Sequence, residues 1–328
     1  RKHDTYQRNS SGRELMDILV INSGSSSVKF KFHDMLNHAC IASGLIEEIG
    51  STHASGSINC ANGRSIKVEN EQIPNHETAI AIAIDLLKQS GVINDLTQVG
   101  GIGHRIVQGA DYFDAPALID DDVMAKIAEL APLAPLHNPA HIMGIKVIQK
   151  LLPGKKNVVV FDTAFHQTMP AKAYMYPYPY EDYTELKVRK YGFHGTSHRY
   201  VSGVAQEMLG KKDSKIIVCH LGNGASISAV QNGKVVDTSM GMTPLAGVMM
   251  GTRTGDVDPA SVIYVMRKRG LSLDEMNNRM NKKSGILGMI GTSSDFRDLD
   301  AAKKAGDEKA ILAYDMFCYR IQLYIGAY

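Results

Sequence analysis

The segment Ile18–Phe32 constrains the fold of this chain most strongly, because it joins two strand patterns through a polar turn. Four consecutive apolar residues at its start predict a buried strand that ends at the turn Asn22–Ser27. In the following strand Val28, Phe30 and Phe32 alternate with two lysines, the period of a strand with one face in the core. Backbone N–H groups, hydroxyls and a lysine around such a turn predict a phosphate-binding loop, although serine-rich turns also join ordinary hairpins.

A second segment, Ile216–Val230, repeats this pattern. It has a short apolar strand, a glycine and asparagine turn at Leu221–Ala225, and a second strand in which Ile227 and Val230 are apolar. Two such units far apart in one chain predict two similar domains that face a shared nucleotide. Neither unit is a Walker loop, because the sequence contains no G-x-x-x-x-G-K-[ST], and no G-x-G-x-x-G follows a strand.

The length of 328 residues accommodates two domains with separate cores. A formal net charge of +2 gives no general attraction to nucleic acid or to membranes, so any anion site must be local. The four cysteines form no C-x-x-C pair, which argues against a zinc ribbon or a disulfide framework and favours a cytoplasmic protein. We expect neither a membrane span nor a signal peptide, because the apolar runs are too short.

Apolar periodicity along the rest of the chain predicts strands followed by helices, which is typical of an α/β fold. We expect further strands near Ile46 and at 65–68, 99–107 and 157–162, helices at 77–89, 120–130, 261–269 and 301–324, and loops at 131–141, 237–259 and 284–298. A tyrosine- and proline-rich break at 162–183 separates a predicted N-terminal domain, residues 16–162, from a C-terminal domain, residues 163–328. Residues 1–15 are polar and aperiodic, so we interpret them as a disordered extension or tag remnant.

Several polar side chains stand where ligands often bind. Arg105 lies beside glycines that would let a ligand approach the backbone, although the same glycines could form a tight turn. Asp162 follows an apolar strand, where ligands bind in open α/β sheets and where a helix cap is equally common. His137 lies within a segment made rigid by three prolines. Arg253 lies in G-T-R-T-G-D, an unusual place for a solvent-facing arginine.

His194 and His198 are four residues apart in Y-G-F-H-G-T-S-H-R-Y, which would place them on one helix face. Gly195 replaces the glutamate of the H-E-x-x-H motif, so the pattern argues against zinc. We expect instead that His194 donates a hydrogen bond to an anion, and that Thr196 or Ser197 caps the helix.

Together these stretches closely resemble the acetate kinase family of short-chain carboxylate kinases, within the superfamily of sugar kinases, heat-shock chaperones and actin. The resemblance extends from Ile18 to the end of the sequence and rests on the ordered motifs N-S-G-S-S-S-V-K-F, G-H-R-I-V, A-P-L-H-N-P, V-F-D-T-A-F-H-Q-T-M-P, Y-G-F-H-G-T-S-H, H-L-G-N-G, G-T-R-T-G-D-V-D-P and S-S-D-F-R-D. It implies two ribonuclease H-like α/β domains with a cleft between them. The implied reaction is reversible, in-line transfer of the γ-phosphoryl group of ATP to acetate, giving acetyl phosphate and ADP, with Mg²⁺ or Mn²⁺. The family also implies a homodimer.

The resemblance implies roles for the matching residues in phosphoryl transfer. Asn22 would hold the metal and the phosphates, assisted by Ser25, Ser27 and Lys29. Arg105 and Arg253 would converge on the carboxylate and the transferring phosphoryl group. His194 and His137 would donate to the phosphoryl oxygens, and Asp162 would orient the acceptor or an arginine.

The resemblance also implies the residues that hold the nucleotide and the acid. The ATP phosphates would be cradled by His220, Leu221, Gly222, Asn223 and Gly224. The adenosine would be flanked by Asp295, Phe296 and Arg297. The methyl group of the acid would be enclosed by Val107, Leu136, Phe193 and Pro244.

These residue types suit the implied chemistry. A carboxylate is already ionised at pH 7, so the reaction needs no general base, and the main obstacle is to bring two anions together in line. Guanidinium groups remain charged and can bind both oxygens of an anion.

The sequence departs from the family at its carboxyl end. Members continue with a G-G-I-G-E-N-type adenosine loop, a glutamate that helps to bind Mg²⁺, and a last helix that returns to the first domain, and the sequence contains none of these motifs. We therefore expect the activity of the parent enzyme. Two alternatives remain open: a propionate or other short-chain fatty acid kinase, although Val107 narrows the pocket and favours acetate, and a catalytically silent nucleotide-binding protein of the actin-like superfamily.

Overall fold

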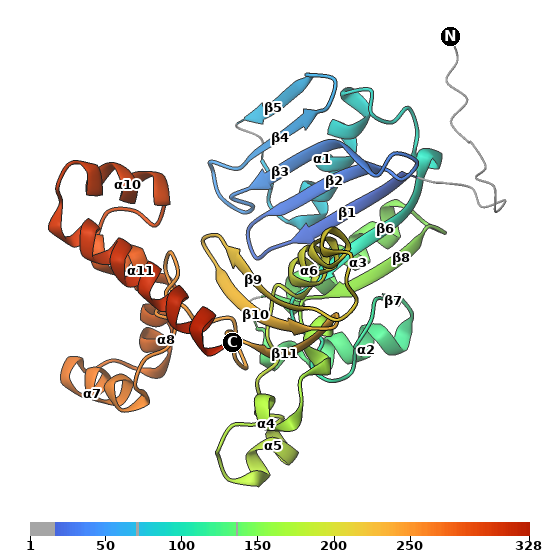
Figure 1. Cartoon of the computed structure of the whole chain (residues 1–328). Coiled ribbons are helices and arrows are strands. Elements are labelled where there is room, and N and C mark those ends of the chain that lie inside the picture. The colour runs from blue at the N-terminus through green and yellow to red at the C-terminus, as the bar shows by residue number, and fades with distance from the viewer. Residues whose placement is uncertain (1–16, 70–71, 136) are drawn as a thin grey trace. The chain divides into compact units, whose positions relative to one another are not determined.

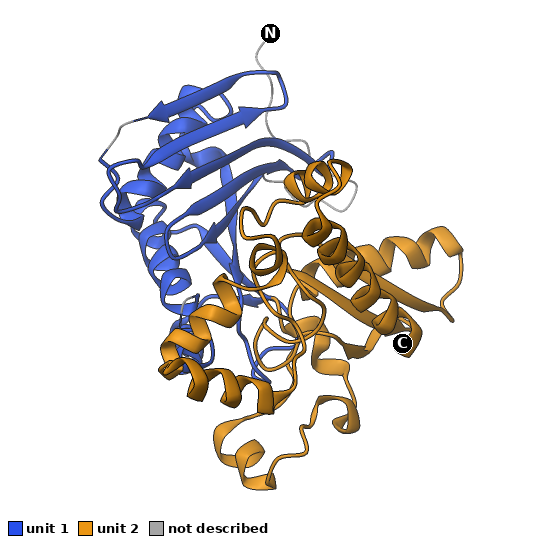
Figure 2. Cartoon of the chain, turned by 90° about the vertical axis from the view of Figure 1, so that its left-hand side faces the viewer, with its two compact units in different colours: residues 1–161 blue, residues 162–328 orange. Residues whose placement is uncertain are grey.

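The computed structural model describes residues 17–69, 72–135 and 137–328. The chain divides into two compact units, residues 1–161 and 162–328 (Figure 2). This division falls one residue before the end of the N-terminal domain that the sequence predicts. The predicted extension at 1–15 lies outside the described residues.

Unit 1 is built on an eight-stranded sheet with the order β5-β4-β3-β2-β1-β6-β8-β7 (Figure 1). Its strands are β1 (Asp17–Ser23), β2 (Val28–Asp34), β3 (Ala39–Glu47), β4 (Ser55–Cys60), β5 (Ser65–Glu69), β6 (Val99–Ile106), β7 (Ala117–Leu118) and β8 (Lys156–Phe161). The first five strands form an antiparallel meander, whereas β6 is parallel to β1 and β8 is parallel to β6. The predicted first hairpin and the α/β fold class are therefore confirmed.

The register of β1 and β2 separates a core face from an open face of this sheet. Ile21 is paired with Phe30, and both side chains are buried in the core cluster of unit 1. Helices α1 (His76–Gln89) and α3 (Asn138–Leu151) pack on this core face and contribute to the same cluster. Asn22 is paired with Lys29 on the opposite face, because successive residues of a strand point to alternate sides.

The segment 131–141 is not the rigid loop that its prolines predict. It contains a short 3₁₀ turn, η2 (Ala131–Leu133), and the first turn of α3. Pro139 lies at the start of this helix, where the missing N–H has no intrahelical partner to lose. The apolar spacing of Ile145, Ile148 and Leu152 carries the helical signal, and all three side chains are buried. Unit 1 is completed by α2 (Asp121–Glu129) and by η1 (Leu96–Gln98).

Unit 2 contains a three-stranded antiparallel sheet with the order β11-β10-β9. The strands are β9 (Lys215–Leu221), β10 (Ala225–Gln231) and β11 (Lys234–Thr238). The hairpin of β9 and β10 has the same antiparallel pairing as that of β1 and β2, so the predicted repeat is confirmed. Unlike β2, β10 is buried on both faces, from Ala225 to Val230. Contacts to the sheet come from α6 (Gly195–Leu209), η3 (Ala164–Thr168) and α11 (Glu308–Ala327).

The remaining helices of unit 2 differ from the sequence-based prediction in two places. They are α4 (Ala171–Tyr174), α5 (Tyr180–Leu186), α7 (Pro259–Arg269), α8 (Leu273–Lys282), α9 (Gly285–Ile290) and α10 (Phe296–Lys304). The predicted loop at 284–298 contains α9. The single helix predicted at 301–324 is two helices, because Gly306 has a positive φ of 85° and Asp307 caps a new helix with its side chain.

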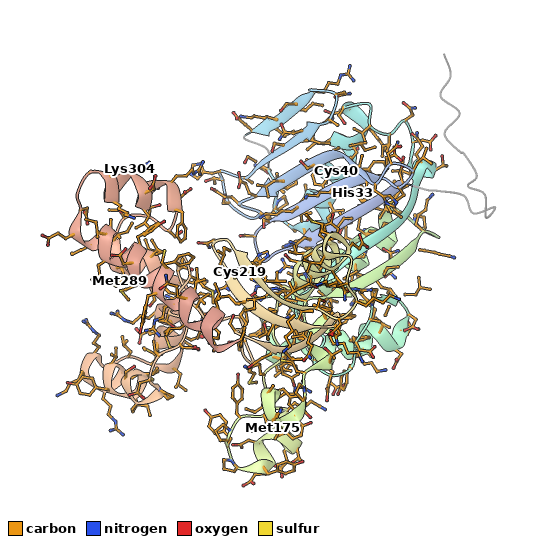
Figure 3. The ribbon with its side chains drawn as sticks, in the orientation of Figure 1. His33, Cys40, Met175, Cys219, Met289 and Lys304 are labelled. Atoms are coloured by element: carbon orange, nitrogen blue, oxygen red, sulfur yellow. The ribbon has the colours of Figure 1, made fainter. Side chains whose placement is uncertain are left out.

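No helix among the described residues is long and apolar enough to cross a membrane. The four cysteines are all free thiols. Cys40 lies on β3 of unit 1 and Cys219 lies on β9 of unit 2 (Figure 3).

Candidate active site

A groove of about 520 Å³ lies on the open face of the sheet of unit 1. Asn22, Lys29 and Arg105, three of the predicted site residues, line it together with Lys31. The register explains this arrangement, since Asn22 is paired with Lys29, and Val20 with Lys31, on the same face. Three cationic side chains beside an amide give the groove the chemistry of an anion site.

The turn between β1 and β2 is fixed by its own backbone and by a histidine. The N–H of Gly24 donates to the carbonyl of Ser27 at 2.7 Å, and Nε2 of His76 donates to the carbonyl of Gly24 at 2.6 Å. Ser25 is exposed and Ser27 is half-buried, and neither lines the groove. Their predicted role in phosphate binding therefore remains a prediction.

A pocket of about 670 Å³ in unit 2 brings together the two predicted nucleotide-binding segments. Its walls are formed by Leu221, Gly222, Asn223, Ser293, Ser294, Asp295, Phe296 and Phe317. Phe317 was not predicted, because nothing in the sequence of α11 distinguishes it from other core residues. Its ring meets that of Phe296 edge to face, with centroids 4.6 Å apart. This aromatic pair gives one wall of the pocket a flat apolar character that suits a nucleotide base.

Asp295 begins α10 and forms an ion pair with Arg297. Its carboxylate accepts from the N–H of Arg297 at 2.8 Å and lies 2.6 Å from Nη2 of the same residue. These hydrogen bonds lower the pKa of Asp295 to about 2. Arg297 is exposed and does not line the pocket, so its predicted contact with adenosine remains a prediction.

The loop that carries Arg253 packs against the turn that lines this pocket. The N–H of Gly251 donates to the carbonyl of Asn223 at 3.0 Å. A Cβ atom at position 251 would lie 1.9 Å from Oδ1 of Asn223, so only glycine permits this approach. Gly251 was not predicted as a site residue, although it is the first residue of the motif G-T-R-T-G-D-V-D-P.

Arg253 and His194 meet at Gly224. A Cβ atom on Gly224 would lie 3.3 Å from Nη1 of Arg253 and 3.6 Å from Nε2 of His194. Nη1 of Arg253 also donates to the carbonyl of Pro244 at 3.0 Å. Burial lowers the pKa of Arg253, but an arginine remains charged at any physiological pH. The guanidinium of Arg253 and the imidazole of His194 therefore both lie close to Gly224, which has no side chain of its own.

The position of His194 is fixed by its backbone. The residue has φ 60° and ψ 22°, a left-handed conformation that costs a non-glycine residue energy, directly before α6. The N–H of Gly195 donates to the carbonyl of Asp162 at 2.9 Å, and a Cβ atom at 195 would lie 2.2 Å from that oxygen. Gly195 thus lets the start of α6 approach the backbone of Asp162.

Contacts with His220 and Ser226 help to hold the ring of His194. It stacks on the ring of His220 with centroids 4.1 Å apart, and its Nδ1 lies 2.8 Å from Oγ of Ser226. His220 is held in turn by Oγ of Ser197 at 2.8 Å. The predicted cap of α6 by Thr196 or Ser197 is therefore wrong, since the helix has no side-chain cap and Ser197 bonds to His220.

No group of three or more histidine, cysteine, aspartate or glutamate side chains in the described part of the chain is arranged to hold a metal ion. Mg²⁺ is commonly held by one or two protein oxygens together with phosphates and water. The amide of Asn22 at the groove of unit 1 fits that mode of binding.

Comparison with known proteins gives the family. The sequence model of the acetokinase family matches residues 17–328. The chain belongs to this family. An acetate kinase of Fusobacterium nucleatum is 55% identical over 316 residues, which cover 95% of this chain and 79% of the relative.

Solved structures of acetokinase family members have the same fold. The crystal structure of Porphyromonas gingivalis acetate kinase matches with a TM-score of 0.90 at 46% identity, covering 95% of this chain and 79% of the other. The structure of a propionate kinase from Francisella tularensis also matches with a TM-score of 0.90, at 40% identity and the same coverage. The fold is therefore that of the acetate and propionate kinases, as the sequence motifs predict.

The residues predicted to enclose the acid in this acetokinase family member are divided between the units. Val107 is buried directly after β6 in unit 1, and Phe193 is buried before α6 in unit 2. Pro244 contacts Arg253 through its carbonyl. Leu136 lies outside the described residues.

Two further predicted site residues belong to the ends of elements. Asp162 directly follows β8 and is buried, and its carbonyl accepts from Gly195. His137 directly precedes α3 as its N-cap residue. His104, beside Arg105, is a structural residue instead, because its Nε2 lies 2.7 Å from Oδ1 of Asn157 and burial lowers its pKa to about 4.

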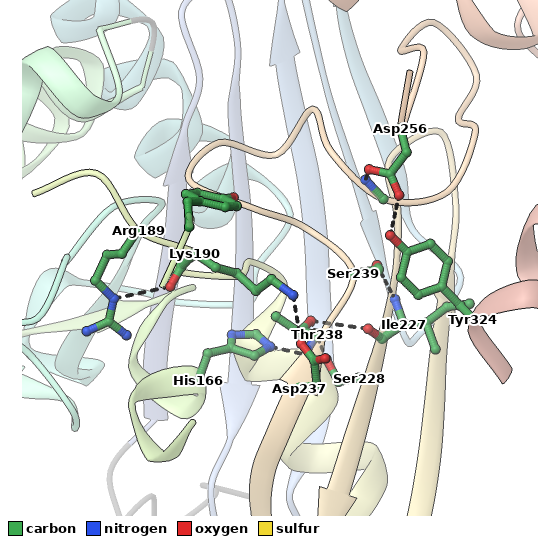
Figure 4. Close-up of polar contacts among 12 residues, drawn as sticks. His166, Arg189, Lys190, Ile227, Ser228, Asp237, Thr238, Ser239, Asp256 and Tyr324 are labelled. Atoms are coloured by element: carbon green, nitrogen blue, oxygen red, sulfur yellow. Dashed lines mark hydrogen bonds and ion pairs between the residues drawn. The ribbon is translucent and has the colours of Figure 1, made fainter. Parts of the chain in front are cut away.

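A polar network supports the sheet of unit 2 in this acetokinase family member (Figure 4). Nε2 of His166 lies 3.2 Å from Oγ of Ser228, which lies 2.8 Å from Oγ1 of Thr238. Lys190 forms an ion pair with Asp237 at 2.7 Å. Burial lowers the pKa of His166 to about 4, so this histidine stays neutral at pH 7.

Proposed function

We propose that this protein transfers the γ-phosphoryl group of ATP reversibly to acetate, giving acetyl phosphate and ADP by direct in-line transfer. The observation that carries the proposal is the meeting of Arg253 and His194 at Gly224, at the end of the turn that lines the pocket of unit 2. A guanidinium and an imidazole donor at one open position suit the oxygens of a phosphoryl group. Membership in the acetokinase family supports the same reaction.

The proposed reaction uses charge rather than proton transfer. The acetate carboxylate is already ionised at pH 7, so it attacks the γ-phosphorus without a general base. The reaction must bring two anions into line, and we propose that Arg253 and Arg105 supply the positive charge that offsets their repulsion.

The pocket of unit 2 holds the nucleotide in this proposal. Phe296 and Phe317 contact the adenine, and the turn Leu221–Gly224 cradles the phosphates. Asn22 would hold Mg²⁺ together with the phosphates of ATP, and the ion would supply positive charge that offsets that of the phosphates. Lys29 adds a further positive charge at the same groove.

Propionate is the second candidate acceptor, because the fold is shared with a propionate kinase from Francisella tularensis. We propose that acetate is preferred, since Val107 would narrow the acid pocket. One methylene group changes the discrimination by about 1 to 3 kcal/mol, a factor of roughly 10 to 200 in kcat/KM. Rates with acetate, propionate and butyrate measure this preference directly.

The test is formation of acyl phosphate, trapped as the hydroxamate, from ATP, Mg²⁺ and each acid. It is made with this chain and with a version of the chain extended beyond Tyr328. Acetyl phosphate formation that is lost in Arg253→Ala supports the proposal. ATP binding without acyl phosphate formation in both proteins would overturn it in favour of a silent nucleotide-binding protein.

We also propose a cytoplasmic homodimer. The free state of all four cysteines supports a reducing compartment. The dimer follows from the family resemblance, and sedimentation equilibrium at micromolar concentration measures it.

A further inference from the structure

Ser226 lies between two histidines in the interior of unit 2. Its Oγ is 2.8 Å from Nδ1 of His194 and 2.7 Å from Nε2 of His198, and the residue is fully buried. A hydroxyl has one proton to donate and can accept from other donors. The protonation of one histidine is therefore linked through Ser226 to that of the other.

His198 determines the direction of this hydrogen-bond chain. Its Nδ1 is buried and has no hydrogen-bond partner among the described residues. A proton on Nδ1 would be a buried donor without an acceptor, which is costlier than a ring nitrogen left as an unused acceptor. His198 must then carry its proton on Nε2 and donate it to Ser226. Burial lowers the pKa of His198 to about 2, so the ring is neutral.

Ser226 must then donate its own proton to His194. The hydroxyl contacts the nitrogens of His194 and His198, and the His198 nitrogen already carries a proton. If His194 also carried a proton on Nδ1, the Ser226 hydroxyl would have no acceptor among the described residues. We propose that His198 and Ser226 are positioning residues that hold His194 as the neutral Nε2–H tautomer.

This tautomer places an N–H donor where Arg253 presents its guanidinium. Nε2 of His194 and Nη1 of Arg253 flank the position of a Cβ atom on Gly224, at 3.6 Å and 3.3 Å. In the other neutral tautomer a lone pair of Nε2 would face the same space and repel an anion. The stacking of His194 on His220 fixes the plane of the ring but does not select which nitrogen is protonated. The consequence for catalysis rests on the proposed function, whereas the tautomer itself does not.

Nitrogen-15 NMR of the labelled protein tests the tautomer without any assay of activity. The His194 signals are assigned by their loss in His194→Gln. We expect a protonated Nε2 and an unprotonated Nδ1 in the wild type, and a mixture of tautomers or imidazolium in Ser226→Ala. Ser226→Thr keeps the hydroxyl and should keep the wild-type pattern. A proton on Nδ1 of wild-type His194, or an unchanged pattern in Ser226→Ala, would overturn the proposal.

His198 provides a second pair of variants in case Ser226→Ala does not fold. His198→Gln places an amide N–H near the position of Nε2 and should preserve the His194 pattern, whereas His198→Leu removes the donor and should not. Ser228→Ala is the matched control. It removes a buried hydroxyl from the same strand, but this hydroxyl bonds to His166 and not to His194. It should leave the His194 signals unchanged, and a change as large as that in Ser226→Ala would count against a specific role of Ser226.

Kinetics separates this proposal from the proposed function. With acetate and ATP, Ser226→Ala should lower kcat by at least about tenfold with little change in KM for ATP, and Ser226→Thr should restore most of it. A change in KM for ATP with unchanged kcat in Ser226→Ala would indicate a structural role and contradict the proposal. If the wild type forms no acyl phosphate but shows the expected His194 tautomer, the proposed function fails and the positioning by Ser226 stands.

Discussion

The hydroxyl of Tyr324 donates a hydrogen bond to the carboxylate of Asp256 (Figure 4). Asp256 lies in the loop that carries Arg253, and its backbone N–H and Oδ1 both bond to Gly247 at 2.8 Å. Burial, together with the nearby carboxylate, raises the pKa of Tyr324 well above its usual range. The contact therefore fixes the Arg253 loop to the helix α11, whose residue Phe317 lines the pocket of unit 2.

Tyr324→Phe should loosen this loop. A hydrogen bond to a charged group contributes about 1.5 to 3 kcal/mol, so we expect the free energy of unfolding in urea to fall by roughly that amount. We also expect kcat to fall more than the affinity for ATP, because Arg253 is less firmly held. Tyr319→Phe on the same helix is the control, since Tyr319 is 58% exposed. Equal effects of the two substitutions would remove the special role of Tyr324.

Loss of either arginine should stop phosphoryl transfer without unfolding the protein. Arg105→Ala and Arg253→Ala should each lower kcat by at least about 10²-fold, because each removes a cation that offsets the repulsion between two anions. Circular dichroism should remain unchanged. Arg267→Ala on the exposed face of α7 is the control and should retain full activity. Wild-type turnover in either variant would exclude that arginine from the mechanism.

Two glycine-to-alanine substitutions should affect different properties, one the turnover and the other the stability. Gly224→Ala adds a methyl group 3.3 Å from Nη1 of Arg253, in the space proposed for the phosphoryl group, so kcat should fall by at least about tenfold while the fold is retained. Gly203→Ala lies within α6, where a Cβ atom meets no atom within 4 Å. It should raise the free energy of unfolding by about 0.5 to 1 kcal/mol and leave kcat unchanged. An active Gly224→Ala enzyme would place the phosphoryl group elsewhere.

Three buried histidines should make the folded state less stable in mild acid. Burial lowers the pKa values of His104 and His166 to about 4 and that of His198 to about 2, from an ordinary value near 6.5. Below pH 6.5 the unfolded chain takes up protons that the folded chain does not, so stability is lost as the pH falls toward 5.

Urea unfolding between pH 7.5 and pH 5 measures this dependence. Each histidine contributes up to about 1.4 kcal/mol per pH unit below pH 6.5. His104→Gln can keep a hydrogen bond to Asn157. It should reduce the pH dependence of the free energy of unfolding by the contribution of one histidine. A free energy of unfolding that is constant between pH 6.5 and pH 5 would show that these rings are not buried as neutral groups.

The sequence was most informative where a local pattern was sufficient. The alternation of Val28, Phe30 and Phe32 predicted β2, because side chains of a strand alternate between core and solvent without regard to distant residues. The segment at 131–141 was wrongly predicted, because a proline that breaks a helix interior also favours the first turn of a helix, and only the apolar spacing downstream separates the two cases. The break at Gly306 was missed because the apolar helical pattern continues on both sides of it.

By itself the sequence determined the two glycine hairpins, the α/β class, the family, and the residue types of the site, because these depend on local periodicity and on ordered motifs. The tertiary structure decided which residues meet: Arg253 with His194 at Gly224, Phe317 with Phe296, and Ser226 between His194 and His198. Such meetings depend on how strands and helices pack across long stretches of chain. A short-range pattern holds no information about the neighbours that packing brings to a buried hydroxyl or to a glycine.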